Sequence, residues 1–357
     1  MYLLREFEVL NFCIIIQRMN IVYSSSDTYA ELCGISLISV LKNDDSNEKN
    51  RVFIINNNIS ELNKEKLISI SNEYGAKLTF IDKPDPEKII HSEIYTGRWN
   101  IGTFFRLYLS SILPKDIERV MYIDCDMIVR KSLASVYNIN LGKCVVAGVD
   151  DCRSDLYRID IGEKPGQLYI NNGFMIIDLK KWRELDIENK VNAFLADRHG
   201  DCTYMDQAPL NGILGKEDLI YELEAKYNAQ RLFFDFSYKQ ILKLRKPEKH
   251  LSLEEYNEAI KDPVVVHFTP VFITGTRPWQ KKDKHKFRPE YLYYKSISPW
   301  KDEPLRKDDR KLPKKIMTII CKLTPKFIMI PIMSYLHAKW YPKKRIKIYQ
   351  KMKGKQK

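Results

Sequence analysis

The stretch Val120-Met121-Tyr122-Ile123-Asp124-Cys125-Asp126 joins a short apolar run to two carboxylates that follow it directly. Apolar residues without alternation predict a buried strand over 120–123. Residues two apart in an extended chain point the same way, so Asp124 and Asp126 are expected to project together at the carboxyl end of that strand. Two hard carboxylate ligands suit Mg²⁺ or Mn²⁺. A polar loop without a ligand is the alternative, because one D-x-D triplet also arises by chance.

Apolar runs of the same kind recur on both sides of this stretch, and helical segments separate many of them. We expect strands at 20–24, 51–55, 77–81, 144–149, 174–179 and 264–268, and helices at 29–41, 60–74 and 103–113. Apolar strands separated by helices predict a doubly wound α/β fold, in which helices cover both faces of a buried parallel sheet. Ligands of such folds bind at the carboxyl ends of the strands, where the two carboxylates are expected.

The positive charge of the chain is concentrated near its C-terminus. The 357 residues include 59 Lys and Arg against 46 Asp and Glu, a formal net charge of +13. Residues 310–357 hold 15 of the basic residues and no acidic one, so residues 1–309 carry 44 basic and 46 acidic side chains. A nearly neutral body lacks the electrostatic support for nucleic-acid recognition. The 14 glycines form neither a G-x-G-x-x-G fingerprint nor a P-loop, so any nucleotide is bound without a glycine cradle.

The cysteines and the N-terminus bear on the compartment. Seven scattered cysteines without a C-x-x-C pair argue against a disulfide framework or a structural zinc site and favour a reducing compartment. Residues 1–18 contain the apolar run 9–16 but lack the basic n-region and the small-residue cleavage site of a signal peptide. Residues 1–18 are either a native segment or a non-native or upstream extension, and the sequence does not decide between the two.

Several further motifs follow one another along the chain. They are Asn20-Ile21-Val22-Tyr23, Thr103-Phe104-Phe105-Arg106-Leu107, the D-x-D triplet, Asn171-Asn172-Gly173-Phe174, Leu179-Lys180-Lys181-Trp182, Asp206-Gln207, Asn211-Gly212 and His267. Together they resemble glycosyltransferase family 8, the retaining hexosyltransferases that include glycogenin and bacterial lipopolysaccharide galactosyltransferases. The resemblance covers about residues 19–300. It implies a GT-A fold, a nucleotide-sugar donor that is usually UDP-glucose or UDP-galactose, and Mn²⁺, with Mg²⁺ as the alternative.

The resemblance also implies which side chains bind the metal and the donor. The metal ligands of the family fall on Asp124, Asp126 and His267, and this set leaves coordination positions for the donor diphosphate. Taken alone, His267 would be read as a core histidine after the apolar run 264–266. The positions that match donor contacts are Tyr23, Ser24, Ser26, Thr28, Arg106, Asp124, Cys125, Asp126, Asp150, Asn171, Asp206, Gln207, His267, Gly275 and Arg277.

The chain departs from the family pattern in two regions. Ser26 and Thr28 stand where the family often has an acidic residue and asparagine, and the neighbouring Asp27 could compensate. The spacer between His267 and Gly275 is longer than in the family, and Arg277 replaces a lysine. An arginine can still hold a phosphate through two hydrogen bonds.

Gln207 bears on how the anomeric configuration is retained. Double displacement needs a carboxylate nucleophile on the β face of the sugar, and an amide is a poor nucleophile. We therefore expect a front-face mechanism, in which the donor phosphate assists the incoming hydroxyl and Gln207 stabilises the oxocarbenium-like sugar. Asp206 as the nucleophile is the alternative, and both remain open.

These observations divide the chain into an extension at 1–18, a GT-A catalytic domain at 19–300 and a basic, amphipathic tail at 301–357. Lys322, Pro325, Lys326 and Pro331 interrupt the apolar runs of the tail, so none has transmembrane length. Lysines mixed with Tyr335, Trp340 and Tyr341 are typical of segments that bind an anionic membrane surface.

We therefore predict a cytoplasmic enzyme that lies on the inner face of the cell membrane, beside a saccharide or lipid-linked glycan acceptor. Its role would be to extend a bacterial lipopolysaccharide, capsule or related glycan. A disordered or RNA-binding tail is the alternative for residues 310–357. Two other functions remain open: a catalytically idle GT-A partner in a glycosylation complex, and a module whose function lies in its membrane- or RNA-binding tail.

Overall fold

The computed structural model describes residues 18–46, 49–91, 101–271 and 275–354. Residues 1–17 of the predicted extension, and residues 272–274 of the spacer before Gly275, lie outside the described residues. The main sheet contains β1 (Asn20–Ser26), β2 (Arg51–Asn57), β3 (Lys77–Asp82), β4 (Arg119–Ile123), β6 (Val146–Asp150), β7 (Ile170–Asp178) and β8 (Ile220–Glu222). Its strand order is β3-β2-β1-β4-β7-β6-β8.

The main sheet is parallel except for one strand, which corrects the prediction of an all-parallel sheet. β7 pairs antiparallel with both β4 and β6, whereas β1, β2, β3 and β4 pair in parallel. A continuous apolar run marks a buried strand but carries no information on its direction. Because β7 is reversed, its first residues lie beside the carboxyl end of β4, and the Asp124 N–H donates to the Gly173 carbonyl at 2.8 Å.

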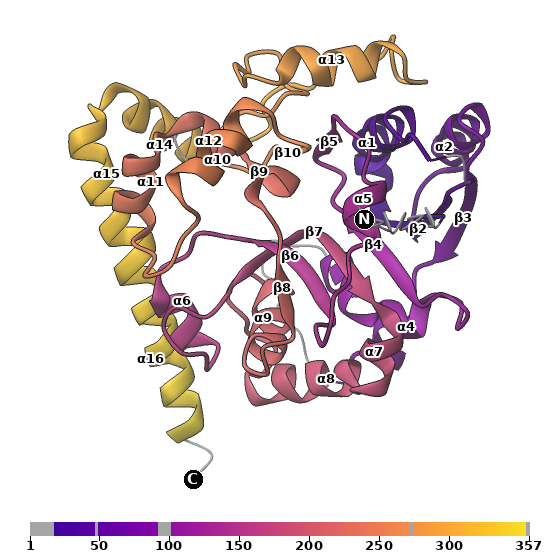
Figure 1. Cartoon of the computed structure of the whole chain (residues 1–357). Coiled ribbons are helices and arrows are strands. Elements are labelled where there is room, and N and C mark those ends of the chain that lie inside the picture. Colours follow the sequence, from indigo (N-terminus) through magenta and orange to yellow (C-terminus); the bar gives the residue numbers. More distant parts are fainter. Residues whose placement is uncertain (1–17, 47–48, 92–100, 272–274, 355–357) are drawn as a thin grey trace, which may run out of the picture.

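Helices cover both faces of the main sheet, as predicted (Figure 1). Along β1, Ile21 and Tyr23 belong to one apolar core and Val22 to the other, since side chains alternate across a strand. The first core includes α1 (Ala30–Lys42) and α2 (Glu61–Glu73), and the second includes α7 (Leu179–Glu184), α8 (Ile187–Asp197) and α9 (Gln207–Leu214). The predicted helix over 103–113 is instead a 3₁₀ segment, η2 (Ile101–Tyr108), followed by the short α4 (Leu109–Ile112).

A second, smaller sheet lies at the carboxyl edge of the main sheet. It has the order β5-β10-β9, with β5 (Met127–Val129), β9 (Ala229–Gln230) and β10 (Val265–His267). The chain enters β5 directly after Asp126, and the register pairs Met127 with His267. Two segments that lie far apart in the sequence are thereby brought together.

The predicted tail is helical and packs against the rest of the chain. It forms α14 (Leu312–Leu323), α15 (Lys326–Ser334), the π-helical η4 (Tyr335–Trp340) and α16 (Tyr341–Gly354). Of these, α15 lies beside α11 (Tyr238–Arg245) and α16 beside α6 (Asp155–Asp160) (Figure 1). Tyr157 donates its hydroxyl to the His337 carbonyl at 2.7 Å, and Arg345 pairs with Asp201 at 2.8 Å. Among the described helices, none is long and apolar enough to cross a membrane.

Candidate active site

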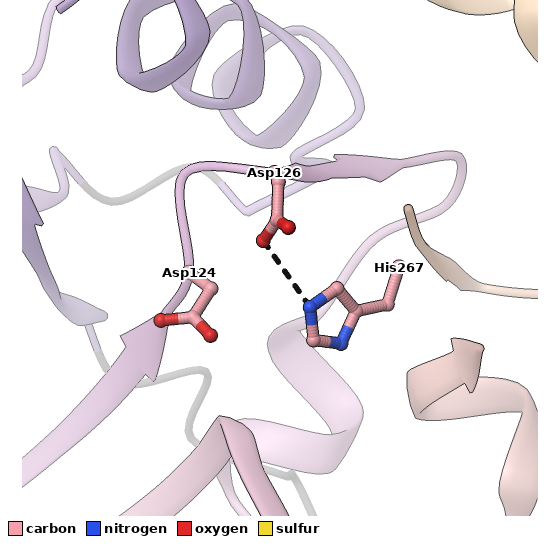
Figure 2. Close-up of side chains that lie close together, drawn as sticks. All are labelled: Asp124, Asp126 and His267. Atoms are coloured by element: carbon pink, nitrogen blue, oxygen red, sulfur yellow. Dashed lines mark ion pairs between the residues drawn. The ribbon is translucent and has the colours of Figure 1, made fainter. Parts of the chain in front are cut away.

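Asp124, Asp126 and His267 converge at the carboxyl end of β4 (Figure 2). Each offers one ligand atom, and these atoms all lie within 4.8 Å of one another. His267 Nε2 lies 3.2 Å from Asp126 Oδ1, and the Arg277 guanidinium donates to Asp126 Oδ2 at 2.8 Å. Burial opposes ionisation of Asp126, but His267 and Arg277 outweigh it and hold the pKa of Asp126 below its usual range. Burial raises the pKa of Asp124, although the charge of Arg106 partly offsets the effect.

A chain of hydrogen bonds fixes the orientation of the His267 ring. The Gly173 backbone N–H donates to Asn171 Oδ1 at 3.2 Å, and Asn228 Nδ2 donates to the same oxygen at 2.9 Å. The other end of the Asn228 amide, Oδ1, therefore faces His267 Nδ1 at 2.9 Å and accepts its proton. With Nδ1 facing Asn228, Nε2 is the ring nitrogen directed at the carboxylates, where a metal ligand is needed.

Gly173 provides the space in which these groups meet. A Cβ atom at this position would lie 2.6 Å from His267 Cε1 and 2.8 Å from Asp124 Oδ2. Any side chain would therefore displace one of the three converging groups. The close approach of the β7 backbone lets two carboxylates and one imidazole converge, and this donor set fits a divalent metal ion.

Replacing Asn228 with alanine is expected to weaken metal binding by about 10- to 100-fold, because the His267 ring would lose the acceptor that fixes its tautomer. Asn228 is fully buried and contacts His267 at Nδ1, the ring nitrogen that faces away from the carboxylates. The measurement is a Mn²⁺ titration of the wild-type and variant proteins, with thermal melting as a control for folding. Equal Mn²⁺ affinity in a folded variant would remove Asn228 from the site.

Arg106 links the metal-binding end of the site to Asp206. Its guanidinium lies 3.0 Å from Asp124 Oδ1 and 3.0 Å from Asp206 Oδ2, and it donates to the Asn172 carbonyl at 2.7 Å. It also stacks on the Tyr122 ring, 4.4 Å from the centroid. Burial raises the pKa of Asp206 to about 6, although Arg106 opposes this shift.

The Gln207 amide is held by a buried carboxylate that the sequence reading did not select. Asp151 Oδ2 accepts from Gln207 Nε2 at 2.7 Å and from Arg153 Nε at 2.6 Å, while its Oδ1 accepts from Gln230 Nε2 at 2.9 Å. Burial opposes ionisation of Asp151, but Arg153 and Arg245 outweigh it and lower the pKa of Asp151. With Nε2 engaged, the Gln207 carbonyl oxygen is the amide atom available to a ligand.

Arg106, Asp124, Asp126, Gln207 and His267 all border one cavity of about 910 Å³. Most of the residues predicted to bind the metal or the donor line it, namely Ser24, Ser26, Arg106, Asp124, Cys125, Asp126, Asn171, Asp206, Gln207, His267, Gly275 and Arg277. The cavity therefore combines, on a GT-A-like sheet, a divalent-metal donor set, five arginines, an oriented amide and a buried carboxylate.

The family model described as glycosyl transferase family 8 matches residues 20–283. The chain belongs to glycosyltransferase family 8. It is 29% identical over 286 residues to general stress protein A of Bacillus subtilis strain 168, covering 79% of this chain and 94% of that protein. It is 23% identical over 296 residues to the lipopolysaccharide 1,2-glucosyltransferase of Escherichia coli strain K12, covering 81% of this chain and 80% of that protein.

The fold comparison agrees with the family membership. The structure of the galactosyltransferase LgtC in complex with donor and acceptor sugar analogues aligns with a TM-score of 0.66 at 23% identity, over 79% of this chain and 96% of that chain. This likeness shows a shared GT-A fold. The chain is therefore a glycosyltransferase, and the predicted fold class and enzyme class are confirmed.

Three predicted donor contacts lie elsewhere in this family 8 enzyme. Tyr23 is fully buried in the core, where its hydroxyl lies 3.1 Å from Ser36 Oγ. Thr28 is exposed on η1 (Asp27–Tyr29) and is not part of the cavity lining. Asp150 does not line the cavity, because its carboxylate turns to Arg158 at 3.3 Å and His250 at 3.3 Å.

Asp27 does not compensate for Ser26 and Thr28. Its Oδ1 accepts from the Ser60 N–H at 2.9 Å and from Asn63 Nδ2 at 2.7 Å, which ties it to the start of α2. Tyr29 instead lines this part of the cavity.

Sequence reasoning missed several groups of the glycosyltransferase site. Asp151 follows Asp150 directly, so the adjacent pair of aspartates could have drawn attention to both. Which carboxylate faces the cavity depends on a register shift at Gly148–Val149 in β6, and this shift cannot be read from the sequence. Asn228 and Gln230 lie on short elements without a motif. The tail also contributes to the cavity wall, through Arg310, Lys314, Met317, Thr318 and His337.

Proposed function

We propose that this glycosyltransferase transfers glucose or galactose from a UDP-sugar to a glycan or glycolipid acceptor with retention of configuration and with Mn²⁺ as the metal. The observation that carries the proposal is the meeting of Asp124, Asp126 and His267 in the same cavity as the oriented Gln207 amide. The lipopolysaccharide 1,2-glucosyltransferase relative and the likeness to a galactosyltransferase support a hexose donor.

Asp124, Asp126 and His267 would hold the metal, and Arg277 would face the donor diphosphate beside them. A bound divalent ion acts as a Lewis acid that stabilises charge on the departing diphosphate. Arg277 contacts Asp126 at 2.8 Å and lines the cavity, so its remaining donors are placed for phosphate oxygens. Gly275, with φ +68, also lines the cavity, and a Cβ atom at this position would collide with the Arg310 guanidinium of the tail.

Gln207 and Asp206 would face the sugar in different roles. Asp206 Oδ2 already accepts from Arg106 and Asn172, which makes that oxygen a poor nucleophile and favours a front-face reaction. The Gln207 carbonyl oxygen carries partial negative charge and is placed to stabilise positive charge that develops at the anomeric carbon. Asp151 acts through Gln207, because it fixes which end of the amide points into the cavity.

Substitution of Gln207 by alanine is expected to lower kcat by about 100-fold, the usual cost of removing one preorganised electrostatic contact. The matched variant is Gln230→Ala, which removes the other amide bound to Asp151 and should cost less than about 10-fold. Single-turnover sugar transfer by both variants gives the comparison. Intact turnover in Gln207→Ala would remove Gln207 from the mechanism.

The anomeric configuration of the product tests the proposed reaction. UDP-glucose and UDP-galactose carry the sugar in the α configuration, so retention predicts an α-glycoside. The enzyme would be incubated with either donor, Mn²⁺ and candidate glycan acceptors, and the anomeric proton coupling of the product read by NMR. A β-glycoside would overturn the retaining mechanism.

We further propose that the tail binds the anionic inner face of a bacterial cell membrane, where the acceptor would be a lipid-linked surface glycan. Between 310 and 357 the chain has 15 basic residues and no acidic one. Large apolar side chains of the tail are also exposed, among them Leu312, Ile316, Ile319, Leu323, Phe327, Ile332, Tyr335 and Trp340. Exposed apolar groups between lysines are typical of interfacial helices.

Changing Leu323 to aspartate is expected to weaken binding to phosphatidylglycerol vesicles by at least about 10-fold. The change removes an apolar side chain that would insert into the membrane, and the new negative charge is repelled by the anionic lipids. Leu323 is 80% exposed. The matched control is Leu62→Asp on α2, where the leucine is 63% exposed but lies outside the tail. Cosedimentation at low and high salt gives the readout. Equal losses in both variants, or no salt-sensitive binding by the wild-type protein, would contradict the membrane role.

A further inference from the structure

We propose that the cavity contains, beyond Gln207, a subsite in which Arg245 and Arg153 bind an anionic group of the acceptor, either a phosphate or a carboxylate. This inference rests on the proposed glycosyl transfer only in taking the metal-binding end of the cavity as the donor side. Arg153, Tyr204, Arg245 and His337 all line the cavity.

The contacts along the cavity place this cluster away from the metal-binding end. Arg106 connects Asp124 to Asp206, the residue before Gln207. Gln207 in turn contacts Asp151, and Asp151 contacts Arg153. Along these contacts, Arg153 and Arg245 therefore lie on the far side of Gln207 from the metal-binding residues. An acceptor would approach the donor sugar from this side of the cavity.

Arg245 is half-buried and has no ion-pair partner among the described carboxylates. It ends α11, and its Nε is buried without a hydrogen-bond partner. Burial and the repulsion of Arg153 lower its pKa from the ordinary arginine value. An uncompensated guanidinium on a cavity wall is unfavourable unless a ligand neutralises it.

Asp151 does not supply the missing charge. Its Oδ2 accepts from Arg153 and Gln207, and its Oδ1 accepts from Gln230. The Asp151 carboxylate thus balances only one of the two guanidinium groups of Arg153 and Arg245, and the cluster keeps a net positive charge. His337 adds none, because burial and the two arginines lower the pKa of His337 to about 4.

The cluster is also preorganised. Arg153 NH1 donates to the Tyr204 hydroxyl at 2.9 Å, and its guanidinium stacks 4.2 Å from the centre of that ring. Tyr204 and Met205 both have left-handed backbone conformations, with φ of 58° and 55°, a strained arrangement that recurs at ligand sites. The Tyr204 hydroxyl donates to Tyr157, which donates to the His337 carbonyl in the π-helical η4. The tail therefore helps to build this wall.

Planar guanidinium groups suit phosphate and carboxylate oxygens, which they bind through two parallel hydrogen bonds. A neutral sugar hydroxyl offers no charge to offset the surplus. The acceptor class that fits is therefore an anionic saccharide or a glycan bearing a phosphate.

The test is a binding measurement with the donor side filled. Full-length protein with saturating UDP and Mn²⁺ would be titrated with glucose 6-phosphate, glucuronate and glucose. We expect either anionic probe to bind at least about 10-fold more tightly than glucose, and Arg245→Gln to reduce that preference to less than about 3-fold. Arg245→Lys, which keeps the charge, should retain part of it. Thermal melting reports whether each variant is folded.

Arg183→Gln is the matched control, because Arg183 also has buried guanidinium nitrogens without partners but lies outside this cavity. An equal loss in Arg183→Gln and Arg245→Gln would overturn the subsite, as would equal affinity of the wild-type protein for the three probes. A short-chain phosphatidic acid identifies the source of the phosphate. If Arg245 is needed for binding of this lipid but not of the sugar probes, the natural group is a lipid phosphate. If Arg245 is needed for binding of the sugar probes but not of the lipid, the natural group is an anion carried by a sugar.

The proposed function and the subsite fail in different ways. Metal-dependent UDP release together with no anion preference would overturn the subsite only. Arg245-dependent anion binding together with no glycosyl transfer would overturn the proposed reaction and leave the subsite in place.

Discussion

Replacing Arg106 with methionine is expected to remove nearly all transfer activity, by about 1,000-fold in kcat/KM, and to lower the free energy of unfolding by about 3 kcal/mol. Arg106 is 7% exposed and lies between Asp124 and Asp206 at 3.0 Å from each. Methionine fills a similar volume but leaves two carboxylates in a poorly solvated site. Their pKa values would rise, and a protonated Asp124 is a poor metal ligand.

Urea unfolding and UDP release measure the two effects separately. The matched control is Arg198→Met, because Arg198 is 4% exposed and pairs with Asp160 at 3.9 Å outside the cavity. That variant should lose stability while it keeps the rate of UDP release. If Arg106→Met retained more than a tenth of the wild-type rate, Arg106 would have no place in the site.

Asp126→Asn is expected to lower Mn²⁺-stimulated UDP release by about 1,000-fold while the protein stays folded. Asparagine keeps the shape of the side chain but removes the negative charge that faces both His267 and Arg277. Mn²⁺ affinity should fall with it, because a neutral amide is a weaker ligand than a carboxylate.

Asp160→Asn provides the control for the loss of a buried carboxylate. Asp160 is 2% exposed and accepts from Thr203 at 2.7 Å, outside the cavity. We expect this variant to show the wild-type response to Mn²⁺. An Asp126→Asn protein that is still stimulated by Mn²⁺ to the wild-type rate would exclude Asp126 as a metal ligand.

The residues that sequence reasoning located best are those fixed by strand ends. Asp124 and Asp126 follow an apolar run directly, and they do lie together as predicted. The extended chain assumed for that prediction ends at Ile123, however, because Cys125 and Asp126 form a turn that leads into β5. His267 was accessible only through the family resemblance, because its partner strand β5 is three residues long and has no pattern of its own. The direction of β7 was not accessible, since Phe174-Met175-Ile176-Ile177 would be equally apolar in either direction.

Side-chain direction explains most of what was missed. Asp150 and Asp151 are chemically identical and adjacent, and only the irregular pairing of β6 with β7 decides which of them faces Gln207. Tyr23 was misplaced for the same reason, because its position in β1 directs it into the core under α1. The tail was predicted to be a separate basic segment, yet His337 and Arg345 contact the body, and His337 lines the cavity. Long-range packing of this kind leaves no local signal in a sequence.

UDP release from a panel of UDP-sugars, measured with and without Mn²⁺, is the most direct test of a metal-dependent hexosyltransferase. We expect the wild-type enzyme to release UDP from UDP-glucose or UDP-galactose in the presence of glycan acceptors, to lose this activity on chelation of the metal and to regain it when Mn²⁺ is restored. UDP binding should show the same dependence on Mn²⁺. A protein that neither releases UDP from any of these donors nor binds UDP in a metal-dependent way would contradict the proposed function.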